Sequence, residues 1–80
     1  MVRHKQIYVN YFRYGEQDYI PCENCGHMAV HVHHLTFRSQ GGKDEIENLI
    51  GLCHRCHLLA HKDSEFNEYL RDIHKKHIDF

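Results

Sequence analysis

The sequence lacks any long run of apolar residues. None of its apolar stretches approaches the roughly 20 residues that a membrane-spanning helix needs. Residues 1–6 also contain no apolar stretch of the kind that a signal peptide requires. We therefore expect a protein that stays in the cytoplasm and has no membrane contact.

An excess of charge of one sign is missing as well. Ten Lys and Arg stand against eleven Asp and Glu, which gives a formal net charge of −1. This balance excludes a protein that binds nucleic acid through bulk positive charge, but not one that uses single basic side chains beside a bound cation. Repeats, low-complexity segments and linkers are also missing, so the 80 residues predict one small domain.

Sulfur and imidazole are abundant, with four Cys and ten His in 80 residues. A chain of this length buries only roughly 60% of the surface that it exposes when unfolded. Core burial alone leaves such a chain marginally stable, so we expect a metal or a covalent link to stabilise it. The composition, 41% hydrophobic and 26% charged, fits a globular domain rather than a disordered chain.

The cysteines form two C-x₂-C pairs, Cys22 with Cys25 and Cys53 with Cys56. In a reducing compartment, two such pairs predict one closed, tetrahedral, structural zinc site rather than disulfides. Metal binding would supply folding free energy that the small core lacks. Redox-active dithiols are disfavoured, because they usually belong to a thioredoxin-like βαβ unit that this sequence does not resemble.

The apolar pattern predicts a small α+β fold. Residues 3–14 suit an amphipathic helix that ends at Gly15, although a strand is also compatible with this segment. Residues 29–35 and 48–52 predict two strands of an antiparallel hairpin, joined by a long loop over residues 36–45. The zinc would then clamp the open end of this hairpin.

Two helices are predicted to follow the hairpin. The first covers residues 55–62, and Asp63 or Ser64 is the N-cap of the second, which covers residues 64–77. One apolar stripe of the second helix is expected in the core: Phe66, Tyr69, Leu70 and Ile73. Three histidines belong to no cluster in the sequence and are expected at the surface: His4, His74 and His77.

Four other histidines are placed to bind a cation and to move a proton. His57 and His61 are four residues apart, so they share one helix face and reach a single cation. His33 and His34 are adjacent in a strand and point to opposite faces, so one of them can join that cation while the other is free for proton transfer. Phosphodiester hydrolysis requires a cation with open coordination positions, such as Mg²⁺, Mn²⁺, Ni²⁺ or Zn²⁺, and a base beside it.

The combination resembles the HNH endonuclease family and its ββα-metal core, also called the His-Me finger. The resemblance covers residues 22–61 through these motifs: Cys22-x₂-Cys25, Val30-His31-Val32-His33-His34-Leu35, Gly41-Gly42, Glu47-Asn48-Leu49 and Leu52-Cys53-x₂-Cys56-His57-x₃-His61. It implies a zinc-stabilised domain over residues 1–80 with its core at 22–62. The N-terminal segment 3–19 and the C-terminal helix 64–77 would pack on that core.

The resemblance also implies an enzyme, a metal-dependent endonuclease that nicks DNA or cuts both strands. His33, His57 and His61 correspond to the ligands of the catalytic divalent metal, and His57 is also the second His of the family name. His34 corresponds to the general base that activates water. Asn48 corresponds to the Asn that bonds the loop backbone and orients the base. The structural zinc ligands of the family correspond to Cys22, Cys25, Cys53 and Cys56.

Two other functions are compatible with the sequence. A non-catalytic zinc module that binds DNA or a protein, as in a phage packaging or recombination complex, needs the cysteines but leaves the His and Asn set without a role. Metal storage by excess histidine would not need the ordered spacing.

The resemblance also implies partners and a location, because very small HNH proteins are common in phages and bacteria. DNA is the expected partner, and phage packaging or recombination proteins are possible further partners. The host cytoplasm is the expected location if a phage encodes the chain. We expect a monomer or a weak dimer whose candidate phosphate contacts are Arg38, Lys43, Arg55 and Lys62.

Overall fold

A computed structural model describes residues 3–15 and 17–78. Two 3₁₀ turns, η1 and η2, accompany the helices and strands, and the chain runs in the order α1 (Arg3–Phe12), β1 (His31–His34), η1 (Arg38–Gln40), η2 (Ile46–Asn48), β2 (Leu49–Leu52), α2 (His54–Lys62) and α3 (Ser64–Ile78). The strands form a two-stranded antiparallel sheet in which His31 pairs with Leu52 and His34 with Leu49. The predicted α+β class, a hairpin followed by a helix and flanked by further helices, is confirmed. Among the described residues, no helix has the length and apolarity to cross a membrane.

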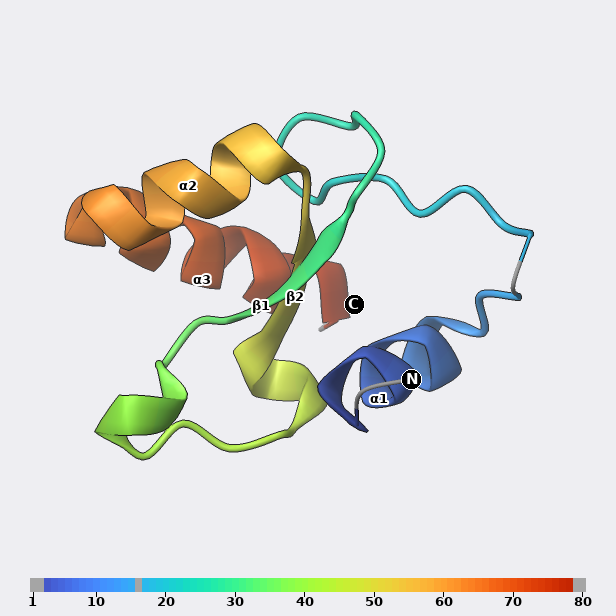
Figure 1. The fold of residues 1–80 in the computed structure, drawn as a ribbon, viewed down its shortest axis with the longest axis horizontal. Coiled ribbons are helices and arrows are strands. Elements are labelled where there is room, and N and C mark those ends of the chain that lie inside the picture. Colours follow the sequence, from blue (N-terminus) through green and yellow to red (C-terminus); the bar gives the residue numbers. More distant parts are fainter. Residues whose placement is uncertain (1–2, 16, 79–80) are drawn as a thin grey trace.

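The hairpin lies between α1 on one side and the α2–α3 pair on the other (Figure 1). All four residues of β2 are buried, so this strand is the centre of the molecule. The main cluster of buried side chains joins β2 to the cysteine loop and to both later helices: Cys22, Leu35, Ile50, Leu52, Cys56, Ala60 and Leu70. Removing this apolar surface from water is what fixes α2 and α3 against the sheet.

The predicted elements exist, but their ends are shifted. The helix α1 ends at Phe12, short of the predicted boundary, because Arg13 adopts a left-handed conformation with φ 61°. The strands are shorter than the predicted ranges 29–35 and 48–52, since the pairing covers four residues in each. Asn48 therefore belongs to η2 and not to the strand that follows it.

The last helix begins where the sequence predicts. The carboxylate of Asp63 accepts hydrogen bonds from two N–H groups of the first turn, at 3.0 and 3.2 Å, so Asp63 is the N-cap. Leu70 is fully buried, and Phe66 and Ile73 pack against the same core. The prediction that Tyr69 joins them is wrong, because its side chain is 55% exposed. A phenol can stay at the water interface without leaving its hydroxyl unsatisfied.

The expected surface position of His74 is also wrong, because this side chain is 1% exposed. Its Nδ1 lies 2.9 Å from Oε1 of Glu23, and its Nε2 lies 2.6 Å from the carbonyl oxygen of Ile46. The hydroxyl of Tyr8 donates to the other oxygen of Glu23 at 2.6 Å. This buried polar group joins α1, the first cysteine loop and α3, and each member finds the partner that burial demands.

Candidate active site

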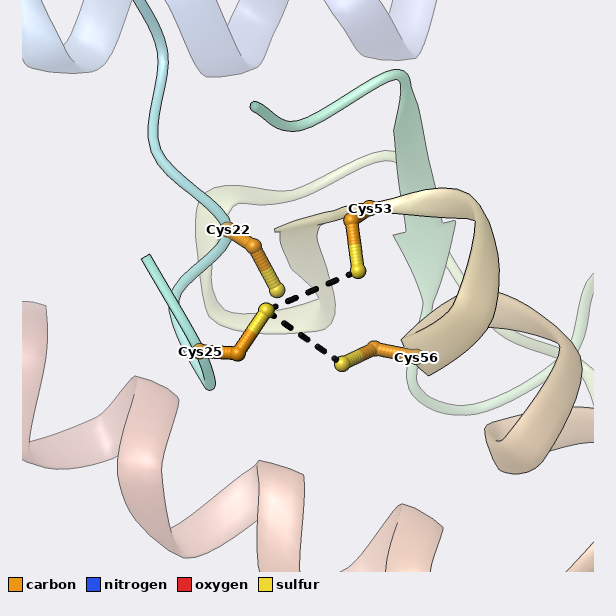
Figure 2. A group of neighbouring side chains, drawn as sticks. All are labelled: Cys22, Cys25, Cys53 and Cys56. Atoms are coloured by element: carbon orange, nitrogen blue, oxygen red, sulfur yellow. Dashed lines mark hydrogen bonds between the residues drawn. The ribbon is translucent and has the colours of Figure 1, made fainter. Parts of the chain in front are cut away.

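The four cysteine sulfurs converge where the hairpin ends and α2 begins (Figure 2). Their Sγ atoms all lie within 4.8 Å of one another, and Cys25 lies 3.6 Å from Cys53. Burial alone would raise the pKa of Cys22, but hydrogen bonds from backbone N–H groups lower it to about 7. The thiol of Cys22 is therefore a ready metal ligand, and four cysteine sulfurs at these separations fit a closed tetrahedral Zn²⁺ site.

Three imidazoles converge at a second place, between β1 and α2. His33 belongs to β1, and His57 and His61 lie one turn apart on α2. One ring nitrogen of each lies within 4.8 Å of the other two, and the Nε2 atoms of His57 and His61 are 3.2 Å apart. Together with His34, these side chains line a cleft of about 270 Å³. The donor set fits one divalent cation with coordination positions left open toward the cleft.

Burial keeps two of these imidazoles, those of His33 and His57, neutral, which a metal ligand requires. The pKa of His57 is lowered to about 4, first by burial and then by the surrounding imidazoles, among them His31 and His33. His31 stacks on His57 with ring centroids 4.2 Å apart. Burial also lowers the pKa of His33, whose side chain is 2% exposed. At neutral pH both His57 and His33 therefore present a lone pair.

Asn67 of α3 is a site residue that sequence reasoning missed. Its Nδ2 donates to the carbonyl oxygen of Leu35 at 2.8 Å, and its Oδ1 lies 2.8 Å from Nε2 of His33. Because the first contact fixes the orientation of the amide, Oδ1 accepts from the Nε2–H of His33. The lone pair of that ring is then on Nδ1. Asn67 and His33 are 34 residues apart, and no local motif links them.

His34 has a carboxylate partner that the sequence also did not reveal. Its Nε2 lies 2.7 Å from Oδ1 of Asp44, in the loop between the strands. The hydrogen bond with His34 is the main cause that lowers the pKa of Asp44, so this carboxyl is ionised and accepts the Nε2–H. In the neutral form of the His34 ring, Nδ1 then carries the lone pair. The expected surface position of His4 needs correction, because its half-buried ring packs on His34 with centroids 4.7 Å apart.

Asn48 holds this loop together by its side chain. Its Oδ1 accepts from the N–H of Thr36 at 2.6 Å, and its Nδ2 donates to the carbonyl oxygens of Thr36 and Lys43, both at 3.0 Å. The two arms of the loop are thus tied to one buried amide. Since Asp44 directly follows Lys43, the same bonds place the carboxylate that contacts His34.

The four basic side chains that are candidate phosphate contacts differ in whether they line the cleft. Arg38 is exposed and contributes to the cleft wall, together with Ser39 and Phe37. The other three are exposed and lie outside that lining: Lys43, Arg55 and Lys62. Of the predicted phosphate contacts, Arg38 is therefore the one beside the three imidazoles.

Comparison with known proteins shows the family. The chain matches the HNH endonuclease family over residues 22–63. It belongs to the HNH endonuclease family. A curated relative, the type IV methyl-directed restriction enzyme EcoKMcrA of Escherichia coli (strain K12), is 32% identical over an alignment of 63 positions. That alignment covers 66% of this chain and 23% of that enzyme. This HNH chain thus spans less than a quarter of the length of that relative, and no solved structure matches it significantly.

Proposed function

We propose that this chain is a metal-dependent endonuclease that hydrolyses phosphodiester bonds in DNA. The observation that supports the proposal is that two different groups of side chains line one cleft. One is the three-imidazole donor set, and the other is His34 with its hydrogen bond to Asp44. A cation and an oriented base beside the same phosphate are what this hydrolysis needs.

His33, His57 and His61 would hold the catalytic cation, which could be Mg²⁺, Mn²⁺, Ni²⁺ or Zn²⁺. Such a cation, when bound, polarises the phosphate and stabilises the leaving oxygen. Asn67 keeps the His33 ring in the tautomer that a ligand needs. The cysteines would hold a structural Zn²⁺, and because Cys56 directly precedes His57, this zinc site also positions the first turn of α2.

His34 acts as the general base at Nδ1, where it takes a proton from the attacking water. Asp44 accepts the Nε2–H of that ring, which fixes the tautomer and stabilises the imidazolium that forms. Asn48 acts indirectly, as a positioning residue, because it holds the loop backbone next to Asp44. The guanidinium of Arg38 is placed to contact a DNA phosphate at the cleft wall.

The proposal treats residues 1–80 as one catalytic domain with its core at 22–62. The segment 3–19 and the helix 64–77 then pack on that core, where a ring of α1 lies against His34 and α3 contributes Asn67. Whether one or both DNA strands are cut is an outcome of the assay below.

The proposal is tested by cleavage of plasmid DNA with Mg²⁺, Mn²⁺, Ni²⁺ or Zn²⁺, with metal content measured on the same preparations. We expect cleavage by the wild type and a loss of about 10²–10⁴-fold in rate for His34→Ala, because that is what a general base contributes. The zinc bound by the four cysteines should be retained, and the variant should still melt cooperatively. His77→Ala, which removes an exposed imidazole of α3, is the matched control and should cleave like the wild type.

Two results would contradict the proposal. One is intact DNA with all four ions, which would favour a non-catalytic zinc module. The other is full activity of His34→Ala.

A further inference from the structure

His34 belongs to a second group of metal-ligating side chains, apart from the three-imidazole set. His4 of α1, His34 of β1 and Asp44 of the intervening loop each offer a ligand atom, and these atoms all lie within 4.8 Å of one another. Nε2 of His34 and Oδ1 of Asp44 lie 2.7 Å apart. Two imidazoles and a carboxylate are a donor set that Zn²⁺ and Ni²⁺ accept.

These three side chains are held in place rather than gathered by chance at a mobile surface. The side chains of His34 and Asp44 are 12% and 14% exposed. The helix that carries His4 is docked on β2, where a Cβ at Gly51 would lie 2.9 Å from the hydroxyl oxygen of Tyr8. The loop that carries Asp44 is tied by the buried amide of Asn48 described above. The donors are therefore preorganised before any ion binds.

We propose that His4, His34 and Asp44 bind a second divalent transition-metal ion, and that this ion switches the nuclease off. The inhibitory half of the proposal rests on the proposed role of His34 as the base. A neutral imidazole carries one N–H proton. When Nε2 is a metal ligand, that proton moves from Nε2 to Nδ1, which is the atom that must receive the proton of the attacking water. His34 cannot then act as a base, although no proton has been gained or lost overall.

The choice of ion follows from the donor types. Imidazole nitrogens favour Zn²⁺ and Ni²⁺ over Mg²⁺, which prefers oxygen ligands and keeps its water. The cleavage rate should therefore rise and then fall as the Ni²⁺ concentration increases. The reason is that Ni²⁺ fills the three-imidazole set first and binds His4, His34 and Asp44 at higher concentration. Mg²⁺ should give no such fall.

The variant His4→Phe tests the second site. Phenylalanine keeps an aromatic ring against His34 but has no lone pair for a metal. The measurement is Ni²⁺ binding to the zinc-loaded full chain by isothermal titration, with plasmid cleavage followed over the same Ni²⁺ range. We expect His4→Phe to bind one Ni²⁺ fewer than the wild type. At low Ni²⁺ it should cleave like the wild type, and its inhibitory Ni²⁺ concentration should be at least tenfold higher. The matched control is His77→Phe, at an exposed position of α3, which should follow the wild type.

The possible outcomes separate the two halves of the proposal. Equal Ni²⁺ stoichiometry and affinity in the wild type and His4→Phe would overturn the second site. A lost Ni²⁺ site in His4→Phe, together with full wild-type cleavage when that site is filled, would overturn the inhibition and the base role of His34. Loss of the Ni²⁺ site in His4→Phe, with a wild type that does not cleave DNA at any Ni²⁺ concentration, would support the site and refute the nuclease function. A lost site together with relief of inhibition would support both halves.

Discussion

At the scale of the residue, much of the chemistry depends on where one imidazole proton sits. Asn67 accepts the Nε2–H of His33, and Asp44 accepts the Nε2–H of His34. In each ring this leaves Nδ1 with the lone pair, although one ring is a proposed metal ligand and the other a proposed base. The same residue type therefore serves two purposes, and the partner of the ring, together with its surroundings, decides which.

The residue-scale prediction concerns Asn67→Ala. The variant should weaken binding of the catalytic cation by roughly 10–100-fold, because His33 loses the acceptor that sets its tautomer. Isothermal titration of the zinc-loaded protein with Mn²⁺ measures the change. Asn67→Asp keeps an acceptor oxygen and should bind closer to the wild type. The control is Asn10→Ala, at an exposed position of α1, and equal affinity in all variants would refute the role of Asn67.

At the scale of the element, a buried ion pair links α3 to the first cysteine loop, and the hydroxyl of Tyr8 extends this link to α1. The side chains of His74 and Glu23 are 1% and 2% exposed. Burial alone would lower the pKa of His74, but its hydrogen bond to Glu23 and the charge of that carboxylate raise it above the ordinary value. Both ring nitrogens have acceptors, so the protonated ring satisfies both contacts at once.

This arrangement predicts how stability depends on pH. A raised pKa in the folded state means that the contribution of His74 is complete below its unfolded pKa of about 6.5 and is lost as the pH rises through the folded value. Glu23→Gln should lower the free energy of unfolding by about 3–5 kcal/mol at pH 6, because it leaves a buried charge unpaired. The difference from the wild type should shrink with increasing pH.

Urea unfolding at pH 6 to 9 measures this difference. The matched control is Glu68→Gln, which removes the carboxylate of an exposed pair with Arg71. It should change stability by less than about 1 kcal/mol at every pH. A Glu23→Gln effect that does not vary with pH would show that His74 is not protonated in the folded protein.

At the scale of the whole molecule, the cysteine cluster is the link between its parts. Cys22 and Cys25 lie in the loop after α1, whereas Cys53 and Cys56 lie at the start of α2 (Figure 2). Two of these side chains, Cys22 and Cys56, are also part of the buried core. A metal here would hold the first loop, the end of β2 and the start of α2 in one place.

We predict that removal of zinc unfolds the domain. Structural zinc contributes about 10–16 kcal/mol in comparable small sites, which matches or exceeds the whole stability of a typical domain. A strong chelator should abolish the near-ultraviolet circular dichroism and the cooperative thermal transition, and added Zn²⁺ should restore both. The same chelator saturated with Zn²⁺ is the control. A zinc-free chain that still melts cooperatively would contradict the prediction.

The sequence allowed much of this architecture to be predicted because the signals are local. The C-x₂-C pairs and the alternation around His33 act over a few residues, as does the spacing of His57 and His61. The cap at Asp63 is equally short in range. Element ends were less accurate, because they depend on single backbone conformations such as that of Arg13.

The amino-acid sequence by itself determined the family, the elements, the two cysteine pairs and the three histidines that converge between β1 and α2. Only the tertiary structure decided which partners His33, His34 and His74 have. Asn67, Asp44 and Glu23 lie 34, 10 and 51 residues from the imidazoles that they contact. The physical reason is that a hydrogen bond depends on distance in space and not along the chain. A lone Asn, Asp or Glu carries no periodic signal until folding brings it to a ring.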